Sequence, residues 1–274
     1  MRRFWFECRR FLVCLCLLSL PVSSFAQQNL QINLPEYVDD SHLFYHELIQ
    51  SALVAQGHSV EIGTPGQSLP QKRAFSMLQR GQLSAMWVMP SQARDNDDSI
   101  VRIDFDLTQG LLGKRVLLIA PDQADRFANI ENLAQFRQQA GTAAFGVGWL
   151  DAAVWHANQL QYREIDGEWR RIYRILLNRH GIDYFSRGLT EVLAEQERYP
   201  FLLVEPRLLL VYPADFQLYV SKKHQQLIPI LDAALRRAQE SGLQQRLIDK
   251  YWADDLRELK LDERLRIPLA MPPK

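Results

Sequence analysis

The stretch LQINLPEYVDDSHLFYHELIQSALVAQGHSVEI, residues 30–62, contains the pattern that decides the fold class. Apolar and polar residues alternate over Leu30–Leu34, as they do in a strand with one buried face. Apolar residues then follow helical spacing over residues 42–56, and Gly57 ends that helix. A second short strand is predicted over Ser59–Ile62. This strand–helix–strand order is typical of a sheet whose parallel strands are joined by crossover helices.

The rest of the chain repeats strands and helices in an order that predicts two lobes. Residues up to about 112 form one αβ set, residues 114–209 form a second, and the chain ends in two helices without strands of their own. Those helices must pack on the first set, so the chain crosses between lobes near residues 110–116 and again near 208–216. Two adjacent crossings make a hinge, and the space between hinged lobes is a natural ligand site.

The predicted fold class is therefore α/β, with two lobes that are each built on a parallel-rich sheet flanked by helices. We expect residues 27–112 and 213–274 to form a discontinuous first lobe, and residues 113–212 to form the second. The end of the chain, residues 257–274, is charged and then rich in proline. We interpret it as a strap over the surface.

The first 26 residues are predicted to be an export signal. Four arginines within the first ten residues are followed by an apolar run, Phe11–Leu20, and by small residues at Ser24 and Ala26. A membrane-spanning helix needs about 20 apolar residues, so this run is too short for an anchor. We predict a secretory signal that is cleaved after Ala26 and places the protein in the periplasm.

Removal of the signal changes the cysteine content and the charge. All three cysteines, Cys8, Cys14 and Cys16, lie within it, so the mature chain is expected to have no disulfide and no thiolate metal site. Removing four arginines and one glutamate from 32 basic and 32 acidic residues leaves 28 against 31, a net charge of −3. A dedicated nucleic-acid binder needs a basic surface, so we expect no nucleic-acid partner.

The sequence contains no arrangement of residues that is typical of catalysis or of a metal or cofactor site. The six histidines are scattered. His42 and His46 lie four residues apart on a predicted helix, but the glutamate placement of a zinc protease is missing. We expect these two histidines to be surface residues. A Gly-x-Ser-x-Gly elbow is also absent. We therefore predict a protein that is not an enzyme and that binds no cofactor or metal.

Several motifs, each ordinary alone, follow one another in a specific order from Leu30 to Trp252. They are LQRGQLSAM (78–86), PSQAR (90–94), GVGWLD (146–151), LNRHGIDY (177–184) and AQESGLQQRLIDKYW (238–252). In this order they resemble the bacterial extracellular solute-binding proteins of family 3, which have the type II periplasmic binding protein fold. The segments GWLD, DYFSRG and RIPL are similar to a subgroup with no assigned ligand. The resemblance implies reversible ligand capture by hinge closure in a soluble monomer, with an ABC permease or a membrane receptor as partner.

The resemblance also implies ligand residues in the first lobe. Arg94 matches the position at which amino-acid binders grip the ligand carboxylate, a task that suits a forked guanidinium. The alternative is a solvated loop arginine beside aspartates. Tyr37 follows the first strand, where an aromatic ring often covers the ligand, or else it lies at the surface. Arg73 is a further candidate. Trp87 either stacks on the ligand or belongs to the core.

In the second lobe the resemblance implies backbone N–H groups at a helix start around Gly148, Trp149 and Asp151, where aligned dipoles attract anions. Asp151 has the alternative role of capping that helix. Arg187 and Glu191 lie where amino-acid binders place an aspartate for the ligand ammonium group. Arg187 favours an anionic ligand unless Glu191 neutralises it. The alternative for this pair is a surface ion pair of little energetic weight.

The sequence thus predicts a periplasmic solute-binding protein that captures a small polar, anionic ligand, amino-acid-like or a carboxylate, for an ABC importer. One alternative is a binder that senses its ligand for a receptor without a permease. Another is an enzyme of the dehydratase kind that uses a carboxylate such as Glu191 or Glu36.

Overall fold

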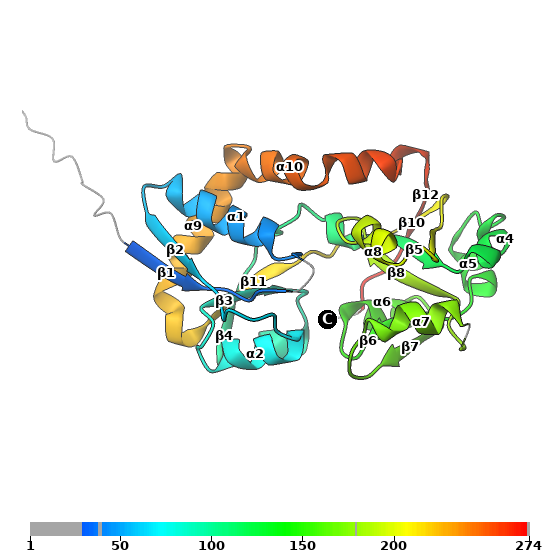
Figure 1. The fold of residues 1–274 in the computed structure, drawn as a ribbon, viewed down its shortest axis with the longest axis horizontal. Coiled ribbons are helices and arrows are strands. Elements are labelled where there is room, and N and C mark those ends of the chain that lie inside the picture. Colours follow the sequence, from blue (N-terminus) through cyan, green and yellow to red (C-terminus); the bar gives the residue numbers. More distant parts are fainter. Residues whose placement is uncertain (1–28, 38–39, 179, 273–274) are drawn as a thin grey trace, which may run out of the picture.

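The structure is a computed structural model that describes residues 29–37, 40–178 and 180–272. The predicted export signal and its cleavage after Ala26 lie outside the described residues. Within these ranges the chain forms two lobes that lie side by side and are joined near the middle of the molecule (Figure 1). None of the helices in the described ranges is both long enough and apolar enough to cross a membrane.

The first lobe is built on two small sheets. Its elements are β1 (Asn29–Asn33), α1 (Leu43–Val54), β2 (Ser59–Gly63), α2 (Gln71–Gln79), β3 (Ala85–Val88), α3 (Gln92–Asp95), β4 (Ile100–Ile103), β11 (Gln217–Ser221), the 3-10 helix η3 (Lys222–Leu227), α9 (Ile228–Glu240) and α10 (Leu243–Glu258). β1 and β2 pair in parallel, and β11 lies antiparallel between β3 and β4. The sheets meet at Asn33, whose carbonyl accepts a hydrogen bond from the Ser84 N–H (2.7 Å). α1 packs against β2 and α9, and α2 packs against β3.

The second lobe is built on one larger sheet. Its elements are η1 (Leu111–Gly113), β5 (Lys114–Ile119), η2 (Pro121–Gln123), α4 (Ala124–Phe127), α5 (Leu133–Gln139), β6 (Ala143–Gly146), α6 (Leu150–Ala157), β7 (Tyr162–Ile165), α7 (Arg171–Leu177), β8 (Tyr184–Gly188), α8 (Val192–Arg198), β9 (Leu203–Val204), β10 (Leu208–Val211), η4 (Leu261–Glu263) and β12 (Leu265–Pro268). The strand order is β12-β10-β5-β8-β6-β7, and β9 also pairs with β5. β6 is parallel to β7 and β8, whereas β5 is antiparallel to β8 and β10.

The hydrophobic patterns of the sequence explain where these elements are buried. β1 alternates, so Leu30 and Ile32 are buried while Asn29 and Gln31 are exposed. β5 contains a continuous apolar run, Val116–Ile119, and every side chain in that run is fully buried. A strand with both faces covered has no need of polar alternation.

The chain crosses between the lobes at the two predicted places, and the buried carboxylate of Asp215 ties the crossings together. One crossing joins β4 to β5 and the other joins β10 to β11. Asp215 accepts hydrogen bonds from Thr108 N (2.9 Å), Thr108 Oγ1 (2.6 Å), Gly110 N (2.7 Å) and Phe216 N (2.7 Å). One side chain therefore fixes the spacing of the two crossing segments.

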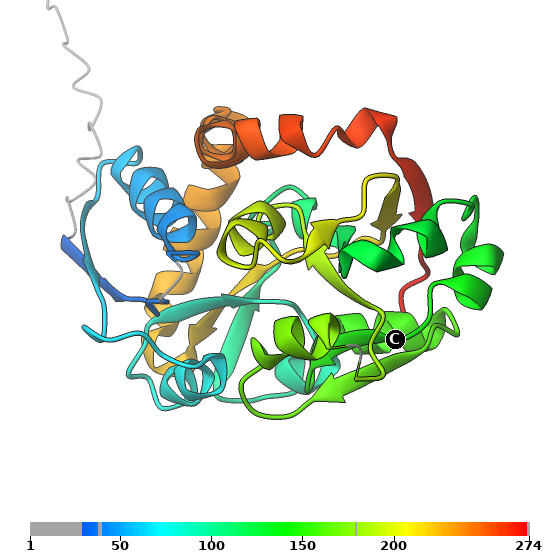
Figure 2. The same cartoon turned by 45° about the vertical axis from the view of Figure 1, so that its right-hand side comes forward.

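A third passage between the lobes follows α10, which the sequence analysis did not predict. Figures 1 and 2 show α10 (orange) running from the first lobe toward β12 in the second. β12 pairs in parallel with β10, and Asn158 exchanges two hydrogen bonds with the backbone of Ala270 (2.8 and 2.9 Å). The assignment of all of 213–274 to the first lobe is therefore wrong for β12, because that strand completes an edge of the second-lobe sheet.

Candidate functional site

The first lobe holds an aromatic group at the end of β1 and along β3. The ring of Trp87 stacks on Tyr45 with centroids 4.5 Å apart, and Tyr37 meets Trp87 edge-on at 5.9 Å. Trp87 is only 3% exposed, so of its two predicted roles the structure supports the core role. Tyr37 is half-buried and forms the outer layer of the group. Its role toward a ligand stays a prediction.

Arg94 lies on α3 and folds back onto the end of β3. Ser91 caps this short helix by accepting from the Arg94 N–H. The Arg94 guanidinium donates to the Met89 carbonyl (2.8 Å) and Ser91 Oγ (3.3 Å), and it lies 5.7 Å from the centre of the Phe75 ring. Burial lowers the pKa of Arg94. Desolvation therefore disfavours the charge of this half-buried guanidinium.

The aspartates beside Arg94 are occupied by other groups. Asp95 pairs with Arg102 (3.3 Å) and accepts from the Tyr219 hydroxyl (2.7 Å). Asp97 accepts from Ser99 and Gln79. Within the described part of the chain, no carboxylate lies within ion-pair distance of Arg94. The guanidinium thus retains the charge that a ligand carboxylate requires.

Arg187 lies on β8 and pairs with Glu195 in α8 and with Glu191 at the N-cap of α8. Its Nε and Nη2 donate to Glu195 in a bidentate pair (2.8 and 2.6 Å), and Nη2 also pairs with Glu191 (2.9 Å). Burial disfavours the charge, but the two glutamates outweigh it, so the pKa of Arg187 lies well above its ordinary value. Burial also raises the pKa of Glu195, against the effect of Arg187.

Aromatic rings enclose the same guanidinium. The Arg187 Cζ lies 5.5 Å from the Trp149 ring centre, 5.0 Å from that of Trp169 and 4.9 Å from that of Phe185. These distances suit cation–π attraction, which is stronger where water is excluded. The predicted alternative of a surface ion pair with Glu191 is wrong, because the Arg187 side chain is only 5% exposed.

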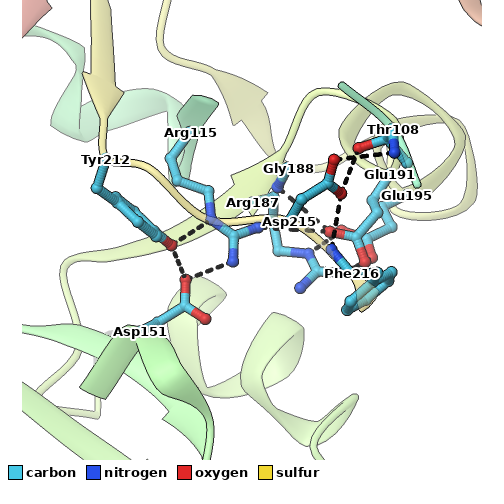
Figure 3. A network of polar contacts seen from close by, with 10 residues as sticks. All are labelled: Thr108, Arg115, Asp151, Arg187, Gly188, Glu191, Glu195, Tyr212, Asp215 and Phe216. Atoms are coloured by element: carbon cyan, nitrogen blue, oxygen red, sulfur yellow. Dashed lines mark hydrogen bonds and ion pairs between the residues drawn. The ribbon is translucent and has the colours of Figure 1, made fainter. Parts of the chain in front are cut away.

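Asp151 belongs to a buried network that continues from Glu191, as Figure 3 shows. It accepts from Arg115 Nη2 (2.5 Å) and from the Tyr212 hydroxyl (2.7 Å), and Arg115 in turn lies 3.6 Å from Glu191. The predicted cap by Asp151 is wrong, since Trp149 is the N-cap of α6 and no side chain caps it. The carboxylate is instead buried as the partner of Arg115.

The turn before α6 needs its glycines, one for a left-handed backbone conformation and one for close packing of a ring. Gly148 has a φ of 76°, a left-handed value that glycine tolerates best. Its N–H donates to Glu164 (2.9 Å). A Cβ on Gly146 would approach the Trp149 indole to 2.5 Å, so this glycine lets the ring pack over the strand end. Trp149 is half-buried between Arg187 and solvent.

Arg73 lies outside these groups, whereas His42 and His46 border the aromatic group. Arg73 is exposed on α2. The expectation that His42 and His46 are surface residues is wrong, since His42 is 7% exposed and His46 is half-buried. A groove of about 520 Å³ lies between α8 and α10, but none of the predicted ligand residues lines it. No cluster of three or more metal-ligating side chains occurs among the described residues.

Sequence reasoning missed the partners that decide the role of each predicted arginine. Glu195, Arg115 and Tyr212 were not identified. Glu195 lies four residues after Glu191, so helical spacing puts both on one face of the segment that begins α8. Arg115 directly precedes the apolar run Val116–Ile119 of the same strand, which indicates a buried partner.

Solved structures with the same fold support the two-lobed architecture. The substrate binding protein of an amino acid ABC transporter is 15% identical over 81% of this chain and 99% of its own, with a TM-score of 0.56. A probable amino-acid ABC transporter extracellular-binding protein from Bacillus subtilis is 12% identical over 82% and 99%, with a TM-score of 0.60. An amino acid ABC transporter substrate-binding protein from Streptococcus pneumoniae, bound to L-arginine, is 13% identical over 81% and 93%, with a TM-score of 0.55.

The predicted resemblance is therefore confirmed at the level of the fold. The chain has the two-lobed α/β fold of substrate-binding proteins of amino-acid ABC transporters. No protein-family model matches the sequence, and no curated protein matches it. Identities of 12 to 15% show a shared fold and leave the ligand to be argued from the residues of this chain.

Proposed function

We propose that this protein is a solute-binding protein that captures a small polar solute between its lobes and delivers it to an ABC importer. The fold supports this role, because its relatives of known structure bind amino acids for such transporters. The proposal rests on the position and the charge of Arg94. Its half-buried guanidinium lies at the end of β3 and contacts no carboxylate of the described chain.

The ligand that fits best carries one carboxylate, as an amino acid does. The anionic-ligand hypothesis used both Arg94 and Arg187, and Arg187 is neutralised by Glu191 and Glu195. The buried network contains two arginines and three carboxylates, so it has an excess of one negative charge. A second anionic group near Glu191 would be repelled, which favours a monocarboxylate or a zwitterion over a dianion.

Other candidate residues complete the proposed site. Tyr37 and Arg73 would contact the ligand from the first lobe, and Gly148, Trp149 and Glu191 from the second. Glu191 is 24% exposed, which leaves part of its carboxylate accessible. We leave Asp151 and Trp87 out of the proposed site, because each is buried among partners of its own chain.

The cellular setting follows from the same proposal. Residues 1–26 would direct export to the periplasm, where the protein would act as a monomer that binds no nucleic acid. Its partner would be an ABC permease. We propose binding without chemistry, so the solute should be recovered unchanged from the protein. A solute that is converted would instead favour the enzyme alternative.

A thermal-shift panel of the standard L-amino acids and small carboxylates tests this proposal. A ligand present at 100 times its Kd should stabilise the protein by about 2.7 kcal/mol. Arg94→Ala should abolish the shift while the unliganded melting temperature stays close to that of the wild type. Arg236→Ala is the matched control, since this arginine lies exposed on α9 and pairs with Asp232. A ligand shift that survives Arg94→Ala would place the site elsewhere.

A further inference from the structure

Two histidines hold the loop that carries Tyr37. His42 Nδ1 lies 3.2 Å from the Tyr37 amide nitrogen, and His46 Nε2 lies 2.9 Å from the carbonyl oxygen of Pro35. The two rings lie 4.9 Å apart on the first turns of α1. The two histidines therefore contact the backbone of Tyr37, which is proposed to cover the ligand, and of Pro35, two residues before it.

These contacts fix the protonation of both rings. A backbone N–H only donates, so His42 Nδ1 must accept and carries no proton. A carbonyl only accepts, so His46 Nε2 must carry one. His42 is thus a neutral imidazole with its proton on Nε2. His42 also occupies the N-cap of α1, where the helix dipole disfavours a cation.

Several charged and phenolic groups of the described residues lie near the pair. Burial lowers the pKa of His46, the hydrogen bond to the Pro35 carbonyl opposes this effect, and His42 and Glu36 contribute smaller effects of opposite sign. Tyr37 and Tyr45 are the neighbouring phenols. Glu47, the next residue on α1, is held by Lys250 and Tyr251.

The pair also lies on the side of the first lobe that approaches the second. Burial raises the pKa of Tyr45, which lies between the two histidines in sequence, and the carboxylates of Asp215 and Glu191 raise it further.

We propose that His42 and His46 are positioning residues that hold Tyr37 for the ligand, and that the hold is lost when His42 takes up a proton. The ligand part of this statement rests on the proposed function. Protonated His42 would direct an N–H toward the Tyr37 N–H, so the bond cannot persist. Ligand affinity should then be lower when His42 is protonated than when it is neutral.

Nuclear magnetic resonance of the purified, ligand-free protein tests the hold directly. The ring nitrogens of His42 and the amide of Tyr37 are followed from about pH 7.5 to about pH 5.5. We expect His42 Nδ1 to be unprotonated at the higher pH, and the Tyr37 amide to move with the same midpoint as the His42 ring. In His42→Asn the side-chain oxygen replaces Nδ1 and does not titrate, so the Tyr37 amide should keep its position throughout.

Two further variants separate positioning from packing. His42→Leu removes the acceptor, so the Tyr37 amide should be displaced at every pH. His46→Gln keeps a donor toward Pro35 and should behave like the wild type at neutral pH. A protonated Nδ1 at about pH 7.5, or a Tyr37 amide that is unmoved in His42→Leu, would overturn the proposal. Because no ligand is present, this result is independent of whether the proposed function is correct.

Discussion

Replacement of Arg187 by Met should destabilise the protein strongly, because Arg187 is a structural cation. The variant removes a bidentate pair with Glu195 (2.8 and 2.6 Å), a contact with Glu191 (2.9 Å) and the cation–π contacts. Removing one partner of a buried ion pair costs about 3–5 kcal/mol, since the remaining charge stays buried. A domain of ordinary stability, about 5–15 kcal/mol, would lose a large fraction of it.

Urea unfolding with linear extrapolation measures this loss. In Arg187→Met, Glu195 lacks its cation, so its pKa, which burial already raises, should rise further. A raised carboxyl pKa contributes stability at low pH that is lost as pH rises through the folded-state pKa. The difference from the wild type should therefore be smaller at about pH 5 than at about pH 8.

The double variant Arg187→Met/Glu195→Leu is the matched control. It removes the stranded charge, so it should recover most of the lost stability. Surface substitutions usually change the free energy of unfolding by no more than about 0.5 kcal/mol. If Arg187→Met alone changes it by no more than this, the structural role of Arg187 is refuted. Arg187 would then again be a candidate for ligand binding.

Three other substitutions test the connections between the lobes. Asp215→Asn leaves at least one donor, such as Phe216 N–H, without an acceptor, and should lower the free energy of unfolding by about 2–4 kcal/mol in urea. Thr108→Val removes only the hydrogen bond of the hydroxyl group and should lower the free energy of unfolding by about 1 kcal/mol. Equal losses in Asp215→Asn and Thr108→Val would contradict the role of Asp215 in holding the two crossings together. Asn158→Ala removes both bonds to Ala270, so amide hydrogens of β12 should exchange faster while those of β1 are unchanged. Unchanged exchange in β12 would show that Asn158 does not hold the third passage.

Much of the fold was predictable because its hydrophobic patterns are local. Apolar residues follow helical spacing in α1, α2, α9 and α10. β1 alternates apolar and polar residues, as a half-buried strand does, and β5 contains the apolar run of a fully buried strand. The order of these elements was enough to predict two lobes and two crossings.

The missed strands lack a pattern of their own. β12 ends in Pro268 and lies among charged residues, so it reads as a surface strap. It forms a strand only because β10 offers an edge, and proline is tolerated at a sheet edge. β7, with the sequence YREI, is short and half polar, so it also depends on its partner.

The candidate site was less predictable because its partners are distant in sequence. Arg115 meets Asp151 and Tyr212 across separations of 36 and 97 residues. No local pattern pairs such residues, and burial then decides whether an arginine binds a ligand or a neighbour. His42 and His46 show a different limit, because their partners are nearby backbone atoms of the preceding loop, which no side-chain pattern indicates.

The most direct test of the central claim is the distance between the lobes with and without solute. The three cysteines of the sequence all precede residue 17, so the exported chain should accept spin labels only at introduced sites. Lys72→Cys on α2 and Arg174→Cys on α7 place one label on an exposed position of each lobe. In pulsed electron paramagnetic resonance, a mixture of the standard L-amino acids should shift the distance distribution to shorter, narrower values. A distribution that is the same with and without the mixture would contradict capture of an amino acid by lobe closure.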